Sequence, residues 1–140
     1  MQIQPFVQAY LTYNEKVWLL KSRLWIPVGG HLVSKGKGPA HVRDIKYPTD
    51  VLREEIKDKA GTENYYLLHN DEAYLTRNYP TLSPRGDKIH INVVYFGRFN
   101  AMPKVEAKHS GLFELLELEN MTGQLATGVL ENSQLVLKLV

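Results

Sequence analysis

Residues 48–61 carry side chains whose types and spacing suit the binding of a divalent cation or a phosphate group. If this segment is helical, Glu55, Asp58 and Lys59 fall within about one quadrant of its circumference, because each residue advances by about 100°. Carboxylate oxygens are the ligands that hard cations such as Mg²⁺ prefer, and an ammonium group can contact phosphate. The segment therefore offers two carboxylates and one ammonium on one side of a helix.

The same segment predicts the helix that would hold these groups. Pro48 suits the first turn of a helix, and Gly61 is a natural residue at its C-terminal end. Between them, Leu52, Ile56 and Ala60 recur every four residues and predict a face that packs against a core. The three candidate side chains lie beside this face, so the packing of the helix would determine where they point.

An apolar segment, residues 25–31, runs into two adjacent glycines upstream of the helix. Gly29 and Gly30 have no Cβ, so the backbone can turn tightly there or approach a neighbouring group closely. A glycine segment followed by a carboxylate-bearing helix can hold a divalent cation against a diphosphate.

Residues 34–47 are rich in glycine and in positive charge. Lys35, Lys37, Arg43 and Lys46 are balanced by a single acid, Asp44, and glycines and a proline interrupt regular structure. The segment is predicted to be an exposed loop. It is either a solvated surface insertion or a basic lip that attracts an anionic substrate.

The predicted order of elements indicates the fold class. Residues 6–13 and 17–20 predict a strand hairpin, and residues 90–96 predict a central strand because both of its faces are apolar. The near-helical spacing of Leu130, Gln134, Leu137 and Val140 predicts a closing helix. Further short strands are predicted at residues 65–68, 73–75 and 104–108, and residues 111–116 lead into an acidic turn at 117–120. This order predicts an α+β fold of the α/β/α sandwich type, with a mixed sheet flanked by helices.

The composition is ordinary for a soluble globular protein, with 44% hydrophobic and 23% charged residues among 140. We expect one domain, residues 1–140. The chain has no cysteine, which excludes disulfides and thiolate metal sites. Because no signal peptide and no apolar run of roughly 20 residues is evident, we expect a cytoplasmic protein that does not enter a membrane. The formal charge of +2 does not indicate a nucleic-acid partner, and a homodimer is left open.

The spacing of the candidate residues resembles the signature of the Nudix hydrolase family. The matched positions are Gly30, Glu55, Ile56, Asp58, Lys59 and Gly61, with Val51 and Leu52 in the small or apolar positions upstream. The likeness extends to the strand around residue 93 and to residues 113–118, so it covers nearly the whole chain.

This resemblance implies a hydrolase that cleaves the diphosphate bond of a nucleoside diphosphate linked to another moiety. It implies that Mg²⁺ or Mn²⁺ activates the attacking water, with Glu55 and Asp58 as catalytic and metal-binding residues. Gly30 would offer its backbone carbonyl to the same ion. The residues that would contact the small-molecule nucleotide substrate are Lys59, Arg53, Lys37 and Arg43.

The chain also departs from the family pattern. Glu54 stands at the arginine position, and its distance from Gly30 is 54 − 30 = 24 residues, about ten more than in the family, which indicates an insertion in the exposed loop. Gly36 stands where the family has a loop glutamate, a role that Asp44 could serve. Lys59 stands where the family has a metal-binding acid, and an ammonium has no lone pair with which to ligate a cation.

These departures leave alternatives open. A register shifted by one residue would align Arg53 and Glu54 with the family's Arg-Glu pair, but it would bury the carboxylate of Glu55 at a cost on the order of several kcal/mol. A Nudix-fold binding module without turnover is the main alternative function, and a nucleic-acid-associated domain that uses the basic loop is a third. Candidates for a base or ligand late in the chain are Glu106, Glu114 and Glu117.

Overall fold

The computed structural model describes residues 2–34, 44–68, 81–82 and 88–140. A mixed sheet with the strand order β10-β2-β1-β9-β7 runs through the molecule, and β3, β4 and β8 pair with β2, β1 and β9. The strands of this sheet are β1 (Gln2–Tyr13), β2 (Lys16–Lys21), β3 (Trp25–Ile26), β4 (Val28–His31), β7 (Tyr65–Leu67), β8 (Thr81–Leu82), β9 (Lys88–Phe99) and β10 (Ser110–Phe113). A separate small hairpin is formed by β5 (Val33–Ser34) and β6 (Asp44–Ile45).

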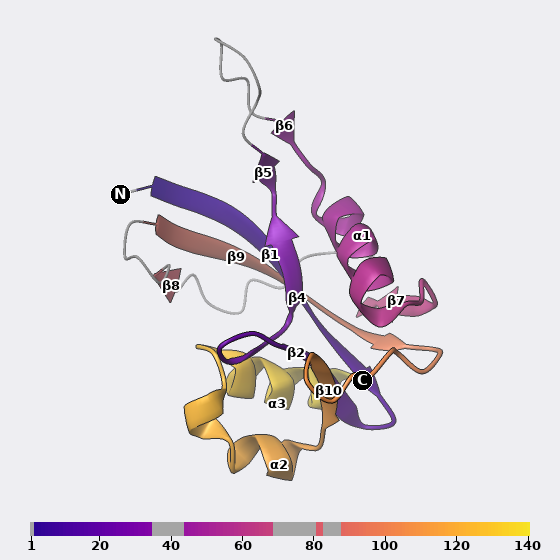
Figure 1. Ribbon diagram of the computed structural model, residues 1–140. Coiled ribbons are helices and arrows are strands. Elements are labelled where there is room, and N and C mark those ends of the chain that lie inside the picture. The colour runs from indigo at the N-terminus through magenta and orange to yellow at the C-terminus, as the bar shows by residue number, and fades with distance from the viewer. Residues whose placement is uncertain (1, 35–43, 69–80, 83–87) are drawn as a thin grey trace.

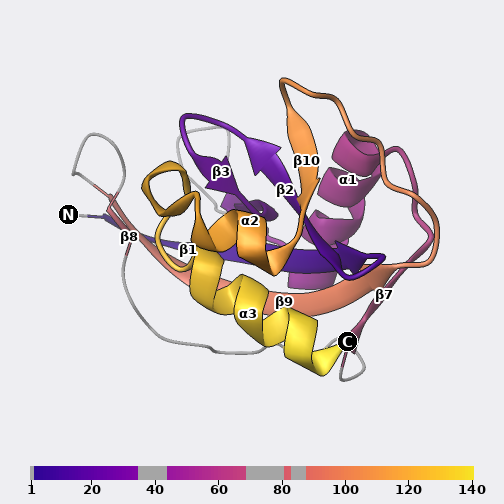
Figure 2. The ribbon, with the colours of Figure 1, turned by 90° about the horizontal axis from the view of Figure 1, so that it is seen from below.

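Helices cover both sides of the sheet (Figures 1 and 2). The helices are α1 (Pro48–Ala60), α2 (Leu115–Glu119), the 3₁₀ turn η2 (Thr122–Gln124) and α3 (Val129–Leu139). Helix α1 packs on one side, and α2 and α3 pack on the other. This arrangement confirms the predicted α+β fold with a mixed sheet flanked by helices. Among the described helices, none has the length and apolar character needed to cross a bilayer.

Strands β1 and β9 pair in parallel over eleven residue pairs. Strand β1 also pairs antiparallel with β2, through a turn at Asn14 and Glu15 in which both residues have positive φ. The predicted hairpin and the predicted inner position of β9 are both confirmed. Parallel and antiparallel pairings around β1 together make the sheet mixed.

Alternate side chains of the inner strands enter two separate cores. On β1, Val7 and Ala9 lie in the core beneath α1, whereas Tyr10 lies in the core beneath α3. On β9, Tyr95 and Phe96 divide in the same way. A period of two is the normal geometry of a strand. Both faces of β9 are apolar because helices cover both sides of the sheet.

Helix α1 packs through the face that the sequence predicts. Leu52 and Ile56 are fully buried, and Val51 and Ala60 are nearly so. The helix ends at Gly61, whose φ of 68° lies in the left-handed region that glycine adopts without strain. The register that buries Ile56 is therefore confirmed, and the alternative register, which would bury residue 55 in its place, is wrong.

Two predictions for the second half of the chain are wrong. Residues 104–108 form no strand, because the backbone N–H of Lys104 donates to the carbonyl of Ala60 at the end of α1 and not to a neighbouring strand. The acidic turn predicted at 117–120 is mostly helix α2, because Glu114 and Glu117 form a capping box that starts a helix.

The closing helix α3 is confirmed, but its buried face differs from the expected one. The predicted spacing joined Leu130, Gln134 and Leu137, which are only partly buried. The buried residues are Val129, Asn132, Ser133 and Val136. Apolar residues lie on both sides of this helix, so their spacing did not determine which side faces the sheet. The strand predicted at 73–75 lies outside the described residues.

We expect Ile56→Glu to destabilise the protein by more than about 4 kcal/mol, because it buries a carboxylate without a partner. Lys57→Glu places the same side chain at the neighbouring exposed position and should cost less than about 1 kcal/mol. Urea denaturation followed by circular dichroism gives both free energies of unfolding. Equal stabilities would show that position 56 does not face the core.

Candidate active site

The backbone of β4 and one carboxylate of α1 meet where the helix packs on the strand. A Cβ placed on Gly30 would lie 2.8 Å from Val51 Cγ1 and 3.6 Å from Glu55 Cγ. The carboxylate oxygen Oε1 of Glu55 would be 3.9 Å from the same point. Gly30 and Glu55, which the sequence assigns to one site, are therefore adjacent in the structure.

Close approach explains both glycines of β4. The strand pairs antiparallel with β1, with Val7 opposite Gly30. A Cβ on Gly29 would overlap the carbonyl oxygen of Val7, and a Cβ on Gly30 would press on Val51 of α1. Only glycine fits such approaches without a shift of the backbone. The same packing holds the Gly30 backbone beside Glu55.

Glu55 differs in its surroundings from Asp50 and Asp58, the two acids of α1 that form ion pairs. Asp50 lies 3.7 Å from Arg53, and Asp58 lies 3.4 Å from Lys59, and all four side chains are well exposed. Glu55 is half-buried, and it forms no hydrogen bond or ion pair with another residue of the described chain. A carboxylate in this state can accept a cation without first losing a protein partner.

The structure gathers some of the predicted site residues and separates others. Glu55, Asp58 and Lys59 share one side of α1, next to Gly30. Arg53 points away from them, because two helical steps turn the side chain by about 200°, and it pairs with Asp50 on that side.

Three residues of the predicted basic loop add nothing to this geometry. Lys37 and Arg43 lie outside the described residues. Asp44 is described only as a backbone position of β6, paired with Ser34. The proposal that the loop contacts substrate therefore stays a prediction.

The three late acids have structural partners. Glu106 Oε1 lies 2.8 Å from the Lys104 ammonium, whose hydrogen bond and charge hold the pKa of Glu106 below its usual value. The same hydrogen bond raises the pKa of Lys104. Glu117 Oε1 accepts the backbone N–H of Glu114 at 3.1 Å in the capping box of α2. Glu106 is thus paired with Lys104, and Glu114 and Glu117 belong to the capping box of α2.

Sequence reasoning missed a segment that holds the C-terminal end of α1. The backbone N–H of Lys104 donates to the carbonyl of Ala60 at 2.8 Å. The carbonyl of Lys104 accepts bonds from Trp18 Nε1 and Ser110 Oγ, both at 3.3 Å. No local pattern marks the bonds to Ala60 and Trp18, because both residues are far from Lys104 in the chain. The segment ties the last turn of α1 to the sheet.

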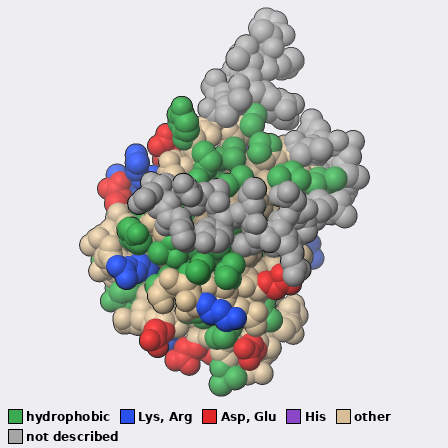
Figure 3. Space-filling model, turned by 180° about the vertical axis from the view of Figure 1, so that it is seen from behind, with side chains coloured by type: hydrophobic (Ala, Val, Ile, Leu, Met, Phe, Trp, Pro, Cys, Tyr) green, Lys and Arg blue, Asp and Glu red, His purple; other side chains and the backbone are tan. Residues whose placement is uncertain are grey.

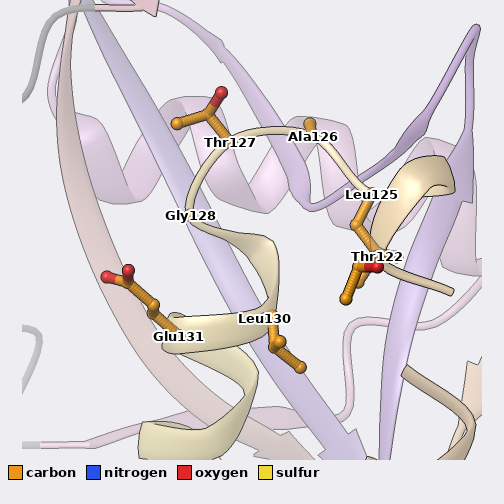
Figure 4. Close-up of a pocket in the computed structure, with 7 residues that line it drawn as sticks. All are labelled: Thr122, Leu125, Ala126, Thr127, Gly128, Leu130 and Glu131. Atoms are coloured by element: carbon orange, nitrogen blue, oxygen red, sulfur yellow. The ribbon is translucent and has the colours of Figure 1, made fainter. Parts of the chain in front are cut away.

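A pocket lies on the opposite side of the sheet, at the start of α3 (Figure 4). It has a volume of about 290 Å³, and Glu131 and Thr127 lie on one side of it with Leu125 and Leu130 on the other. Leu125 and Leu130 pack against the core beneath α3, whereas Glu55 belongs to α1. This pocket is therefore separate from the Gly30–Glu55 site.

The described part of the surface opposite the view of Figure 1 shows both charges. In Figure 3, blue basic and red acidic side chains are interspersed there. Nucleic-acid binding relies on clustered lysine and arginine. The described residues of this face do not provide such a cluster.

Comparison with known proteins identifies the fold. No protein-family model matches the chain, and no curated protein matches it. A Nudix-family hydrolase from Clostridium perfringens has a similar structure, with a TM-score of 0.65 and 18% identity over 100% of this chain and 99% of that one. A Nudix hydrolase from Nitrosomonas europaea gives 0.62 and 12%, over 99% and 90% of the two chains. An ADP-ribose pyrophosphatase from Streptococcus suis gives 0.55 and 18%, over 97% and 90%.

At these identities the likeness establishes the fold, which is that of the Nudix hydrolases. The resemblance inferred from Gly30, the helix and Gly61 is confirmed at this level. In this chain the glycine-bearing strand β4 and the acidic helix α1 lie together at Gly30 and Glu55.

We expect Gly30→Ala to destabilise the protein by about 1–3 kcal/mol, because the added methyl group overlaps Val51 and pushes α1 away from β4. Gly123→Ala is the matched control, since a Cβ there meets nothing within 4 Å. Thermal and urea unfolding of the two variants measure the difference. A Gly30→Ala protein as stable as Gly123→Ala would mean that the helix does not approach the strand this closely.

Proposed function

We propose that this chain, which has the Nudix hydrolase fold, hydrolyses the diphosphate bond of a nucleoside diphosphate linked to another moiety. The observation that carries the proposal is the half-buried Glu55 carboxylate, which has no partner among the described residues and lies against the backbone of Gly30. The likeness to solved Nudix hydrolases, including an ADP-ribose pyrophosphatase, supports the reaction class.

The donors at this site suit one Mg²⁺ or Mn²⁺ ion. The described residues contain no group of three or more acids or histidines that could enclose a metal. They do offer the Glu55 carboxylate, the neighbouring backbone of Gly30, and Asp58, whose Oδ2 is the oxygen engaged by Lys59. Hard oxygen donors of this kind, with waters filling the remaining positions, are typical of Mg²⁺ sites. We therefore propose Glu55, Gly30 and Asp58 as the residues that would hold the ion.

When bound, a divalent ion would neutralise the diphosphate, polarise phosphorus and lower the pKa of a coordinated water. The residues of the chain itself would hold the ion and contact the phosphate. Glu55 gives a negative charge at a position that the packing of α1 holds still. Lys59 provides an ammonium one turn away that can contact a phosphate oxygen. Lys37 and Arg43 remain proposed substrate contacts from the basic loop.

The second candidate function is a binding module that has the same site but no turnover. The observation that favours it is Lys59, which stands beside Glu55 and reduces the negative charge available to a metal ion. Hydrolysis of ADP-ribose in Mg²⁺ separates the two, because a binding module would bind the compound and return it unchanged. We further propose a cytoplasmic protein that acts on small nucleotides, and a homodimer stays open.

Glu55→Gln tests the proposed metal ligand. We expect Mn²⁺ affinity, measured by calorimetry, and ADP-ribose hydrolysis each to fall by about 10–100-fold, because the amide carries no charge. Glu54→Gln is the control, since that carboxylate is the sequence neighbour and is exposed. Both variants should unfold at the temperature of the parent. Equal losses in the two variants would remove Glu55 from the site.

Lys59→Glu tests the effect of the ammonium on the ion. The change shifts the local formal charge by two units and adds a carboxylate one helical turn from Glu55. We expect Mn²⁺ affinity to rise by about tenfold, which corresponds to about 1.4 kcal/mol. Lys57→Glu makes the same charge change on another side of the helix and should alter the affinity far less. If both variants gained equally, only net charge would matter and the position of Lys59 would not.

A further inference from the structure

Three buried side-chain oxygens have no hydrogen-bond partner among the described residues. They are Oε1 of Gln4, Oδ1 of Asn92 and Oγ of Ser133. Only 8% of the surface of Asn92 is exposed, and Ser133 is fully buried. A buried oxygen that accepts no hydrogen bond has lost its contacts with water and gained none in return. Such groups are uncommon in folded proteins, so a ligand that donates hydrogen bonds to them is an explanation worth testing.

All three oxygens lie on the side of the sheet that α3 covers. Side chains alternate along a strand, so Gln4 shares the side of Tyr10 on β1, and Asn92 shares the side of Phe96 on β9. Ser133 is part of the buried face of α3. In the described part of the chain, the core beneath α1 contains no oxygen of this kind.

The two amides lie close together on neighbouring strands. Phe6 is paired with Asn92, and Gln4 is paired with His90, two residues earlier on β9. With strands about 4.8 Å apart and a rise of about 3.3 Å per residue, the Cβ atoms of Gln4 and Asn92 are about 8 Å apart. Both oxygens can therefore accept hydrogen bonds from one group placed between the two side chains.

Phe6 adds an aromatic ring beside Asn92. The ring is half-buried, and His31 of β4 meets it edge to face, with the ring centres 5.0 Å apart. A planar ligand can stack on such a ring. The sheet surface at this point thus combines two hydrogen-bond acceptors with an aromatic ring.

The pocket at the start of α3 lies on the same side of the sheet. Leu125 and Leu130, which line it, pack against the core that contains Val94, the next residue of β9 on the side of Asn92. In Figure 2, α3 begins at the end of the sheet where β1 and β9 also begin, and Asn92 belongs to the first half of β9. The volume of about 290 Å³ suits a small ring system.

Protein atoms cover both amide oxygens, so a ligand reaches them only when a neighbouring side chain turns. Gln4 is half-buried, and a change of rotamer can move its side chain aside. Asn92, held in the middle of the sheet, would then be the fixed acceptor of the site.

The chemistry of these groups selects the ligand. Oxygens accept hydrogen bonds, so the ligand must present N–H or O–H donors. An exocyclic amino group has two N–H bonds, one for each amide oxygen, and Asn and Gln recognise adenine through its amino group. The Glu131 carboxylate on the pocket wall disfavours a phosphate there.

We propose that Asn92 and Gln4, together with Phe6, form a second binding site, on the α3 side of the sheet, for a heteroaromatic base with an exocyclic amino group, such as adenine. This site does not rest on the proposed hydrolysis, because Glu55 belongs to α1 on the other side of the sheet. Two sources supply this chemistry: a free nucleoside, or the base of a nucleotide whose diphosphate binds at Gly30.

The test is calorimetric binding of adenosine and inosine in EDTA. Inosine has the same size but carries a carbonyl oxygen in place of the amino group. We expect the parent to bind adenosine at least about tenfold more tightly than inosine, because the carbonyl would face two oxygens. Asn92→Leu should weaken adenosine binding by about tenfold or more, and Gln4→Leu, at a half-buried position, should act in the same direction.

Thermal unfolding supplies an independent readout. Asn92→Leu removes a buried oxygen that has no partner, so we expect its melting temperature to rise by about 3 °C while adenosine binding is lost. Asn100→Leu makes the same change at an exposed position just beyond β9 and should alter neither property. A gain in stability together with a loss of binding is the signature of a group kept for a ligand.

Three results would overturn the inference: no adenosine binding by the parent, equal affinity for adenosine and inosine, or unchanged adenosine binding in both Asn92→Leu and Gln4→Leu. Kinetics with ADP-ribose in Mg²⁺ then separate the two sources. Competitive inhibition by adenosine would assign the site to the base of the substrate. Adenosine binding that leaves hydrolysis unchanged, or that occurs in a protein without hydrolysis, would assign it to a separate nucleoside.

Discussion

The packing of α1 against β4 is the constraint on which the site depends. Val51 of the helix occupies the space that a Cβ on Gly30 would need, so helix and strand approach as closely as only glycine allows. Leu52 and Ile56, both fully buried, prevent the helix from rotating about its axis. These two conditions fix the position of the Glu55 side chain, because α1 cannot rotate without exposing the apolar side chain of Ile56.

Hydrogen bonds secure the C-terminal end of α1. At the C-terminal end, Gly61 closes the last turn and Lys104 bonds to the carbonyl of Ala60. Trp18 and Ser110 in turn bond to the carbonyl of Lys104, so the end of the helix is tied to the core and to β10. A helix held at its face and at its end can keep a carboxylate at one position, which a metal or phosphate site requires.

The exposed ion pairs of α1 matter more for local charge than for stability. Pairs such as Asp50 with Arg53, at 3.7 Å and open to solvent, contribute little to folding. The pair of Asp58 and Lys59 is equally exposed, yet it determines how much negative charge remains beside Glu55. Because Lys59 is exposed, its charge bears on the proposed site and not on the packing of α1.

Much of the fold and the centre of the site could be predicted from sequence because local rules apply there. The spacing of Leu52, Ile56 and Ala60 together with Gly61 set the register of α1, and thereby the side on which Glu55 lies. The segment around Lys104 that holds the C-terminal end of α1 could not be predicted, because its hydrogen bonds join residues as far apart as Trp18 and Lys104. The buried face of α3 was missed for a related reason: contact with the sheet, and not its own pattern, selected that side.

The most direct test of the account is a crystal structure with Mn²⁺ and a methylene-bridged analogue of ADP, with the ion located by its anomalous signal. The account predicts a single Mn²⁺ at about 2 Å from an oxygen of Glu55, beside the carbonyl of Gly30. It also predicts the Lys59 ammonium within hydrogen-bond distance of a phosphate oxygen. An ion and a diphosphate bound elsewhere, with Glu55 and Lys59 free in solvent, would contradict it.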